Sequence, residues 1–146
     1  MKHLFTFLLV AISATSFAQG NLQFNDVISF GKKINKTLKH RGPDDSGVVK
    51  IGNSMLGHNR LSIIGLEDSY SKQPIVENGN ALIFNGEIYN YIELRNELIE
   101  EGCKFITKSD TEVFMTGLIK YGPNFQHRCN GMWAFCLWDS VKNEAL

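Results

Sequence analysis

The stretch Ala81–Asn90, ALIFNGEIYN, decides how the fold is interpreted, because its apolar run ends at Asn85-Gly86. Asn-Gly between two alternating runs is typical of a β-hairpin. The residues after this pair instead follow helical spacing, at Ile88, Tyr91, Ile92, Arg95 and Leu98. The stretch therefore predicts a strand over residues 81–84, a turn at Asn85-Gly86 and a helix over residues 90–101.

Helices and strands follow one another irregularly along the rest of the chain. Apolar spacing predicts a helix over residues 25–38, which Gly42-Pro43 must end. Capping patterns predict helix starts at Asn90, with Glu93, and at Ser109, with Glu112; Gly102 is expected to end the first of these helices. Strands are expected over residues 48–51, 55–64 and 131–139, the last one fully buried because it is apolar on both faces.

No regular alternation of strand and helix and no glycine-rich phosphate loop is present in the sequence. This pattern favours an α+β fold with antiparallel sheet over a doubly wound nucleotide-binding fold. The 146 residues carry 15 basic and 15 acidic side chains, and no basic cluster suggests nucleic acid. The four histidines are scattered without zinc-ligand spacing, so no metal site is expected.

The first eighteen residues have the layout of a secretory signal peptide. A basic start at Lys2 precedes an apolar run, and small residues lead to Ala18, where cleavage is expected. The run is too short for a comfortable membrane span. A buried first strand is the alternative interpretation. The three cysteines, an odd number without paired spacing, disagree with export, because exported proteins usually pair their cysteines.

Three sites in the sequence suggest binding chemistry. Asn85 and the Gly86 N–H provide two donors for an oxyanion, Arg60 suits a carboxylate, and Asp110 suits an ammonium. Each has an ordinary structural alternative: a plain turn, a surface arginine, and an acid favoured by the helix dipole. Together they describe a pocket for an amino acid with a reactive side-chain carbonyl.

Five segments resemble the class II glutamine amidotransferase domain of asparagine synthetase, in that family's order. They are LKHRGPDDSG, GHNRLSIIG, PIVENGNALIFNGEIYNYIELRNEL, SDTEVFMTGLIKYG and NGMWAFCLWD. The resemblance covers residues 21–146, so we expect residues 1–18 to be a signal-like segment and 21–146 a partial amidotransferase domain. It implies an N-terminal-nucleophile fold, an αββα sandwich of two antiparallel sheets, here incomplete at both ends.

The resemblance also implies hydrolysis of glutamine to glutamate and ammonia, and it assigns roles to single residues. Arg60 would hold the glutamine α-carboxylate and Asp110 the α-amino group. Asn85 and Gly86 would stabilise the oxyanion, and Glu87 would line the pocket. No cofactor is implied in this domain, whereas the family's synthetase domain binds ATP and Mg²⁺.

The family's nucleophile, an N-terminal cysteine whose own amine is the base, has no counterpart here, since no cysteine precedes Cys103. We therefore expect negligible glutaminase activity. One explanation is an amidotransferase end replaced by an export signal through recombination or a gene-model error. A second is a non-catalytic glutamine-binding or interaction module, and a third is processing that exposes Ser13, Thr15 or Ser16.

The expected partners are glutamine and a synthetase domain, and the resemblance is compatible with a homodimer. No nucleic acid and no stable membrane span are expected. The family implies a cytoplasmic location, with export through residues 1–18 as the alternative.

Overall fold

The computed structural model describes residues 10–13, 24–61 and 72–146 of the chain. These residues form two compact units. The described part of the first unit comprises residues 10–13, 24–61, 72–83 and 135–146, and the second comprises residues 84–134. No helix among the described residues is long and apolar enough to cross a membrane.

The elements alternate irregularly between strand and helix, as the sequence predicts. In chain order they are β1 (Val10–Ser13), α1 (Phe24–Thr37), the 3-10 helix η2 (Lys39–Arg41), β2 (Asp45–Ile51), β3 (Ser54–Arg60), β4 (Ile75–Glu77), β5 (Asn80–Ile88), α2 (Tyr91–Glu100), α3 (Asp110–Tyr121), the 3-10 helix η3 (Gly122–Arg128), β6 (Gly131–Asp139) and β7 (Glu144–Ala145).

The strands form two sheets, ordered β1-β3-β2 and β4-β5-β6-β7. In the first sheet β3 pairs antiparallel with both neighbours, and Asp45 of β2 lies opposite Arg60 of β3. In the second sheet, β4 pairs antiparallel with β5, and β6 pairs antiparallel with β7. The predicted α+β class with two antiparallel sheets is confirmed.

The segment β1 lies inside the signal-like stretch of the sequence. Its four residues pair with β3, with Val10 opposite Gly57 and Ser13 opposite Ser54. The structure therefore shows strand geometry here, which is the alternative interpretation of this segment. The remainder of the stretch, including the expected cleavage position at Ala18, lies outside the described residues.

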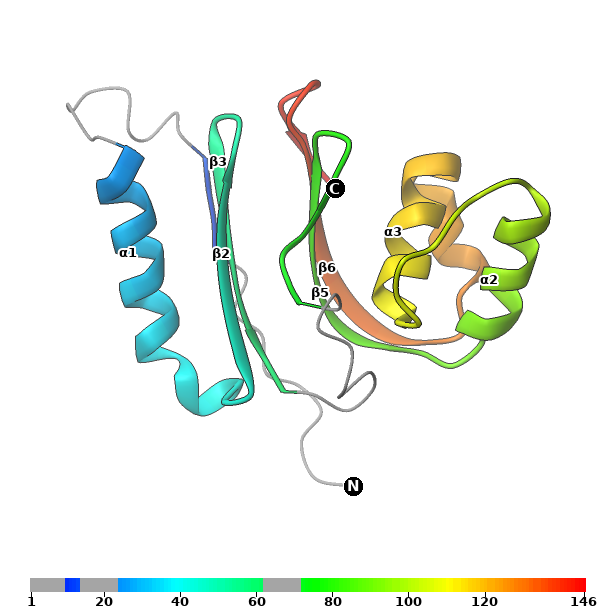
Figure 1. Ribbon diagram of the computed structural model, residues 1–146, viewed down its shortest axis with the longest axis horizontal. Coiled ribbons are helices and arrows are strands. Elements are labelled where there is room, and N and C mark those ends of the chain that lie inside the picture. Colours follow the sequence, from blue (N-terminus) through cyan, green and yellow to red (C-terminus); the bar gives the residue numbers. More distant parts are fainter. Residues whose placement is uncertain (1–9, 14–23, 62–71) are drawn as a thin grey trace. The chain divides into compact units, whose positions relative to one another are not determined.

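In the first unit, α1 lies along β2 and β3, on one face of their sheet (Figure 1). The predicted helix over residues 25–38 is confirmed to within a residue at each end. A buried cluster joins β3 to β5 and β6 within the same unit: Leu56, Ala81, Ile83, Cys136 and Trp138 pack together, with Val49 and Ile51 of β2 against them. This apolar cluster is the core of the first unit.

In the second unit, α2 and α3 lie side by side next to the adjoining parts of β5 and β6 (Figure 1). Phe114 of α3 is the centre of the aromatic core, with ring centroids 5.1 Å from Phe84, 5.8 Å from Trp133 and 6.4 Å from Phe125. Such tilted ring pairs stabilise a core beyond the area they bury. The core fixes α3 against the strands that precede and follow the helices.

The predicted turn at Asn85-Gly86 is wrong, because β5 continues through both residues to Ile88. The turn comes at Tyr89-Asn90 instead. A Cβ on Gly86 would lie 2.2 Å from the Met132 carbonyl oxygen of β6, far below any real contact. Glycine is therefore needed here for the close approach of β6 and not for a turn.

The two predicted capping patterns have different outcomes. Ser109 caps α3 as predicted, its side chain accepting from the Glu112 N–H at 3.3 Å. Asn90 does not cap α2 with its side chain. Its amide instead donates to the Arg128 carbonyl at 3.0 Å and accepts from the Asn130 N–H at 2.8 Å. The tertiary partners of Asn90 thus replace the predicted local bond.

Other boundaries differ in extent. Gly102 ends α2 as predicted. The Gly102 N–H donates to the Ile99 carbonyl and the Cys103 N–H donates to the Leu98 carbonyl, which is the pattern of a Schellman motif. The strand expected over residues 131–139 exists as β6, but only Cys136, Leu137 and Trp138 are buried, so full burial was a wrong prediction. The strand expected over residues 55–64 ends at Arg60, and residues 62–71 lie outside the described residues.

Candidate glutamine site

Asp110 is the first residue of α3 and is buried, with 5% of its surface exposed. Its Oδ2 accepts a hydrogen bond from the Ile88 N–H at 3.0 Å, at the end of β5. Its Oδ1 accepts a longer bond from the Thr111 hydroxyl at 3.4 Å. Both of these donors are uncharged, whereas a buried charge is favoured by a cationic partner.

Burial raises the pKa of the Asp110 carboxyl above its ordinary value, and the charge of Glu87 raises it further. The hydrogen bonds from Ile88 and Thr111 oppose this shift. Glu87 is half-buried and lies next to Ile88 in β5. Two carboxylates are therefore close enough to act on one another, and a ligand ammonium between them would relieve that repulsion.

The structure brings Glu87 and Ile88 close to Asp110, because the bond from Ile88 ties the end of β5 to the start of α3 and the charge of Glu87 acts on the Asp110 carboxyl. Asn85 precedes them in β5, and its side chain is exposed. By strand alternation, Asn85 and Glu87 belong to the face opposite Phe84 and Ile88, which are buried. The two predicted oxyanion donors are neighbours in β5, which pairs with β4 and β6.

The loop before Asp110 is fixed by a second acid, Glu112. Its Oε1 accepts from the Ile106 N–H at 2.7 Å, and its Oε2 accepts from the Thr107 N–H at 2.7 Å and the Thr107 hydroxyl at 2.6 Å. Arg95 of α2 donates to the Thr107 carbonyl at 2.7 Å. These bonds fix the backbone that delivers Asp110 to the end of β5.

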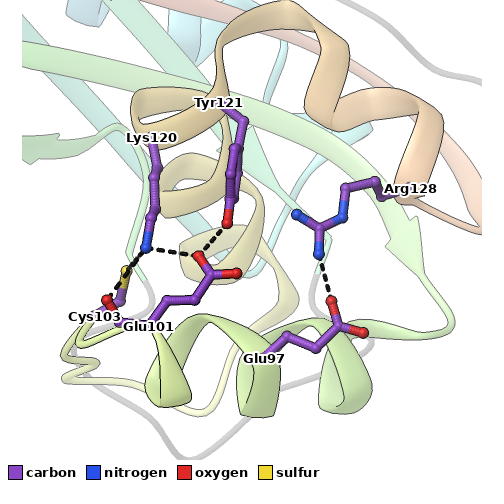
Figure 2. Close-up of polar contacts among 6 residues, drawn as sticks. All are labelled: Glu97, Glu101, Cys103, Lys120, Tyr121 and Arg128. Carbon is purple, nitrogen blue, oxygen red and sulfur yellow. Dashed lines mark hydrogen bonds and ion pairs between the residues drawn. The ribbon is translucent and has the colours of Figure 1, made fainter.

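The other end of α3 is tied to α2 through the side chains in Figure 2. Lys120 Nζ contacts a Glu101 carboxylate oxygen at 2.6 Å and the Glu101 carbonyl at 3.2 Å, and Tyr121 donates to Glu101. Arg128 of η3 pairs with Glu97. These groups are largely exposed, so each pair stabilises little by itself, but together they link α2 to the helix that carries Asp110.

Arg60, the predicted carboxylate-binding residue, is the last residue of β3 in the first unit. It is half-buried, and its carbonyl accepts from the Asp44 N–H at 3.1 Å. The residues at the end of β5 and the start of α3 belong to the second unit. The structure therefore places Glu87 near Asp110 in the second unit, whereas Arg60 belongs to the first unit.

The three cysteines have different surroundings. Burial raises the pKa of Cys129 to about 11, and burial also raises the pKa of Cys136, which lies in the core of the first unit. Cys103 follows the end of α2, with its sulfur 3.8 Å from Lys120 Nζ. Since the thiolate is the nucleophile, Cys129 and Cys136 are poor candidates for covalent catalysis.

A family model of the glutamine amidotransferase domain matches residues 17–146. The chain belongs to this family. Three relatives of this amidotransferase domain carry the name asparagine synthetase (glutamine-hydrolyzing). The putative enzyme of Mycobacterium tuberculosis is 37% identical over 147 residues, covering 94% of this chain and 22% of that protein. Enzyme 1 of Bacillus subtilis is 41% identical over 108 residues, covering 74% and 17%. Enzyme B of Escherichia coli is 38% identical over 128 residues, covering 83% and 22%.

These matches confirm the predicted amidotransferase domain of the asparagine synthetase type. The chain spans 22% or less of the length of these three relatives. Two solved structures share the fold of the amidotransferase domain. The glutamine phosphoribosylpyrophosphate amidotransferase of Bacillus subtilis gives a TM-score of 0.58 at 23% identity, covering 72% of this chain and 31% of that one. An allosteric regulatory enzyme of purine biosynthesis gives a TM-score of 0.63 at 22% identity, covering 78% of this chain and 32% of that one.

Sequence reasoning did not find how Glu112 holds the loop before Asp110, since Glu112 was predicted only as the partner of a cap. It also did not single out the buried Asn35, whose amide bonds to backbone carbonyls of β2 and β3. The signal for Glu112 was its proximity to Asp110 in SDTE, and the signal for Asn35 was a polar residue within the apolar stripe of α1. Neither signal names a long-range partner, which only the tertiary structure supplies.

Proposed function

We propose that this domain binds L-glutamine as the glutaminase part of a glutamine-hydrolysing asparagine synthetase. The family match and the names of the relatives support this proposal. The geometry supports it through Asp110, a buried carboxylate with uncharged partners beside a second acid. Such a group is suited to the α-ammonium of an amino acid, because ionic hydrogen bonds are strongest where water is excluded.

The other site residues have complementary roles in this proposal. Arg60 holds the α-carboxylate with its planar guanidinium. The Asn85 amide and the Gly86 N–H donate to the oxygen that becomes negative when the side-chain amide is attacked. Glu87 lines the pocket and adds to the negative field around the ammonium. The substrate amide is thereby oriented by charges at its α-carbon and activated at its far end.

Hydrolysis also needs a nucleophile, and the raised pKa values of Cys129 and Cys136 argue against these two thiols. Because no cysteine precedes Cys103, the 146-residue chain is proposed to bind glutamine without releasing ammonia. Non-catalytic glutamine binding is accordingly the second candidate function. An oxyanion hole without the covalent step supplies only a part of such rate enhancements.

The proposal includes a synthetase part as the partner that receives ammonia. ATP and Mg²⁺ would serve that part by activating the acceptor, and no role is assigned to them at Asp110 or Arg60. A cytoplasmic location belongs to the same proposal, because ammonia must pass directly to the acceptor site. A homodimer is also proposed, and size-exclusion chromatography with light scattering tests it.

The deciding experiment is calorimetric titration of the purified chain with L-glutamine, with released ammonia measured in the same sample. We expect binding, no ammonia, and weaker binding in Arg60→Ala and Asp110→Asn. Glu93→Gln is the matched control, since Glu93 is an exposed acid in the first turn of α2. Absence of binding by the wild-type chain contradicts the proposed function. Ammonia release by the wild-type chain that disappears in Arg60→Ala contradicts the proposal that the chain binds glutamine without hydrolysing it.

A further inference from the structure

Asn35 is a buried amide on α1 that faces the first sheet, with 5% of its surface exposed. Its Nδ2 lies 2.8 Å from the Gly47 carbonyl, 3.1 Å from the Ser46 hydroxyl and 3.2 Å from the His58 carbonyl. An amide has two hydrogens to share among these three oxygens. The helix therefore bonds to both β2 and β3 at one point.

The position of the Asn35 side chain depends on the absence of a side chain at Gly57 of β3. A Cβ on Gly57 would lie 2.9 Å from the Asn35 Oδ1, so any side chain at this position of β3 would displace the amide. Gly57 is central in β3, three residues before Arg60. The helix amide thus sits directly on the strand that ends in the proposed carboxylate-binding residue.

A second asparagine continues this contact to the neighbour of Arg60. Asn59 Nδ2 donates to the Asn35 backbone carbonyl at 2.8 Å. The Asn59 Oδ1 is buried and has no hydrogen-bond partner among the residues that the structure describes. The bond to α1 is therefore the contact that orients the Asn59 side chain, and it anchors the peptide that joins Asn59 to Arg60.

The same peptide is held from the other side by the HRGPD segment. A Cβ on Gly42 would lie 2.4 Å from the Asn59 carbonyl carbon and 2.7 Å from the Arg60 nitrogen. The Asp44 N–H donates to the Arg60 carbonyl at 3.1 Å. Helix, strand and connecting segment therefore enclose the backbone of Arg60, all within the first unit.

We propose that Asn35 and Asn59 are positioning residues, a latch between α1 and β3 that sets Arg60 and so the affinity for the substrate carboxylate. This inference rests on the proposed glutamine site. It gives the helix that precedes HRGPD a role in substrate recognition through Arg60. The latch acts on the carboxylate end of the ligand alone, and that selectivity separates it from a general contribution to folding.

The test compares L-glutamine with 4-aminobutanamide, which keeps the amine and the side-chain amide but lacks the carboxylate. Calorimetry is carried out on the full chain as wild type, Asn59→Ala, Arg60→Ala and the double variant. We expect Asn59→Ala to weaken glutamine about fivefold, the cost of one lost hydrogen bond acting through Arg60. It should leave 4-aminobutanamide unchanged and have no further effect in the Arg60→Ala background.

Asn80→Ala is the matched control, because Asn80 also makes one side-chain bond to a backbone carbonyl, to Asn78 at 3.3 Å, at the start of β5. It should change neither affinity. The latch is overturned if Asn59→Ala lowers the affinity for both ligands equally. It is also overturned if Asn59→Ala lowers glutamine affinity by the same factor with and without Arg60. In either case the proposed glutamine site stands.

A ligand-free measurement keeps the two proposals separable. Phenylglyoxal modifies arginine, and peptide mass spectrometry reports its rate at Arg60. We expect Asn59→Ala to change this rate and Asn80→Ala to leave it as in the wild type. An unchanged rate at Arg60 overturns the latch whether or not glutamine binds. If Asn59→Ala changes the phenylglyoxal rate at Arg60 but the wild-type chain does not bind glutamine, the proposed function and the latch's role in recognition are contradicted.

Discussion

At the scale of single residues, backbone donors fix the acidic side chains at and beside the proposed site. Asp110 is held by the Ile88 N–H, and Glu112 by the N–H groups of Ile106 and Thr107. Glu112 accepts three hydrogen bonds from the loop before α3, which suits a structural role. Asp110 keeps oxygen capacity for a ligand, because a carboxylate has about four acceptor positions.

The first prediction concerns Asp110→Asn. The amide keeps an oxygen for the Ile88 N–H but loses the charge that the ammonium needs. We expect glutamine affinity to fall roughly tenfold to a hundredfold, the range for a hydrogen bond to a charged group. Calorimetry measures the loss, and Glu93→Gln should bind as the wild type does. Unchanged affinity in Asp110→Asn would remove Asp110 from the site.

The second prediction concerns Cys129. With a pKa of about 11, roughly one thiol in a thousand is ionised at pH 8, so alkylation by iodoacetamide should be slow. The rate should rise about tenfold per pH unit below that pKa. Cys103, half-exposed beside Lys120, should react faster. Peptide mass spectrometry over time measures both rates, and fast labelling of Cys129 at neutral pH contradicts the prediction.

At the scale of elements, the start of α3 and the end of β5 carry the proposed site. Ser109 and Glu112 satisfy donors at the start of the helix, including two from the loop before it. Gly86 lets β6 approach β5 where any side chain would collide. The helix cap and Gly86 each involve only a few neighbouring residues, but each positions another segment of the chain.

The third prediction compares two glutamates in the same helical position. Glu93 and Glu112 are each the third residue of their helix. Glu112→Gln should lower the free energy of unfolding by about 2–3 kcal/mol, because a buried charge with three donors is replaced by a neutral amide. Glu93→Gln, at an exposed position, should stay within about 0.5 kcal/mol. Urea unfolding measures both, and equal effects would contradict the structural role of Glu112.

The fourth prediction concerns Gly86→Ala. The added Cβ would collide with the Met132 carbonyl and with Trp133, so β6 must move away from β5. We expect a loss of about 1–3 kcal/mol, the range for overpacking. Asn80→Ala, at the partly exposed start of β5, should have a small effect. Thermal unfolding gives the comparison, and a Gly86→Ala chain as stable as the wild type would show that the strands are not so close.

At the scale of the whole molecule, acid titration links the site to stability. The pKa of Asp110 is raised in the folded chain, so between its unfolded and folded values the folded state binds more protons. The free energy of unfolding must therefore fall as the pH rises through this interval. Burial of the Asp110 carboxyl in the second unit therefore makes the chain less stable at neutral pH than at acid pH.

The fifth prediction uses this sign. Relative to Asp110→Asn, the wild-type chain should lose stability as the pH rises from below about 4, the usual Asp value, toward neutrality. Thermal unfolding of both proteins across this range measures the difference. Adding L-glutamine should reduce the difference at neutral pH, since a bound ammonium favours the charged carboxylate. A difference independent of pH would show that Asp110 titrates normally.

The sequence by itself determined the elements whose signals are local. It predicted α1 from apolar spacing and the start of α3 from Ser109 and Glu112, and its motifs identified the amidotransferase family. These predictions rest on neighbours within a few residues. The α+β class followed from the irregular order of helices and strands.

Only the tertiary structure decided where distant groups meet. Asn85 and Gly86 lie inside a strand because β6 packs closely against β5 there. The Asn90 side chain bonds to the Arg128 carbonyl and does not cap α2. The bond from Ile88 to Asp110 and the bond from Asn59 to α1 join segments more than twenty residues apart. Such contacts override local preference because they depend on which distant segments the fold brings together, and this cannot be deduced from neighbours in the sequence.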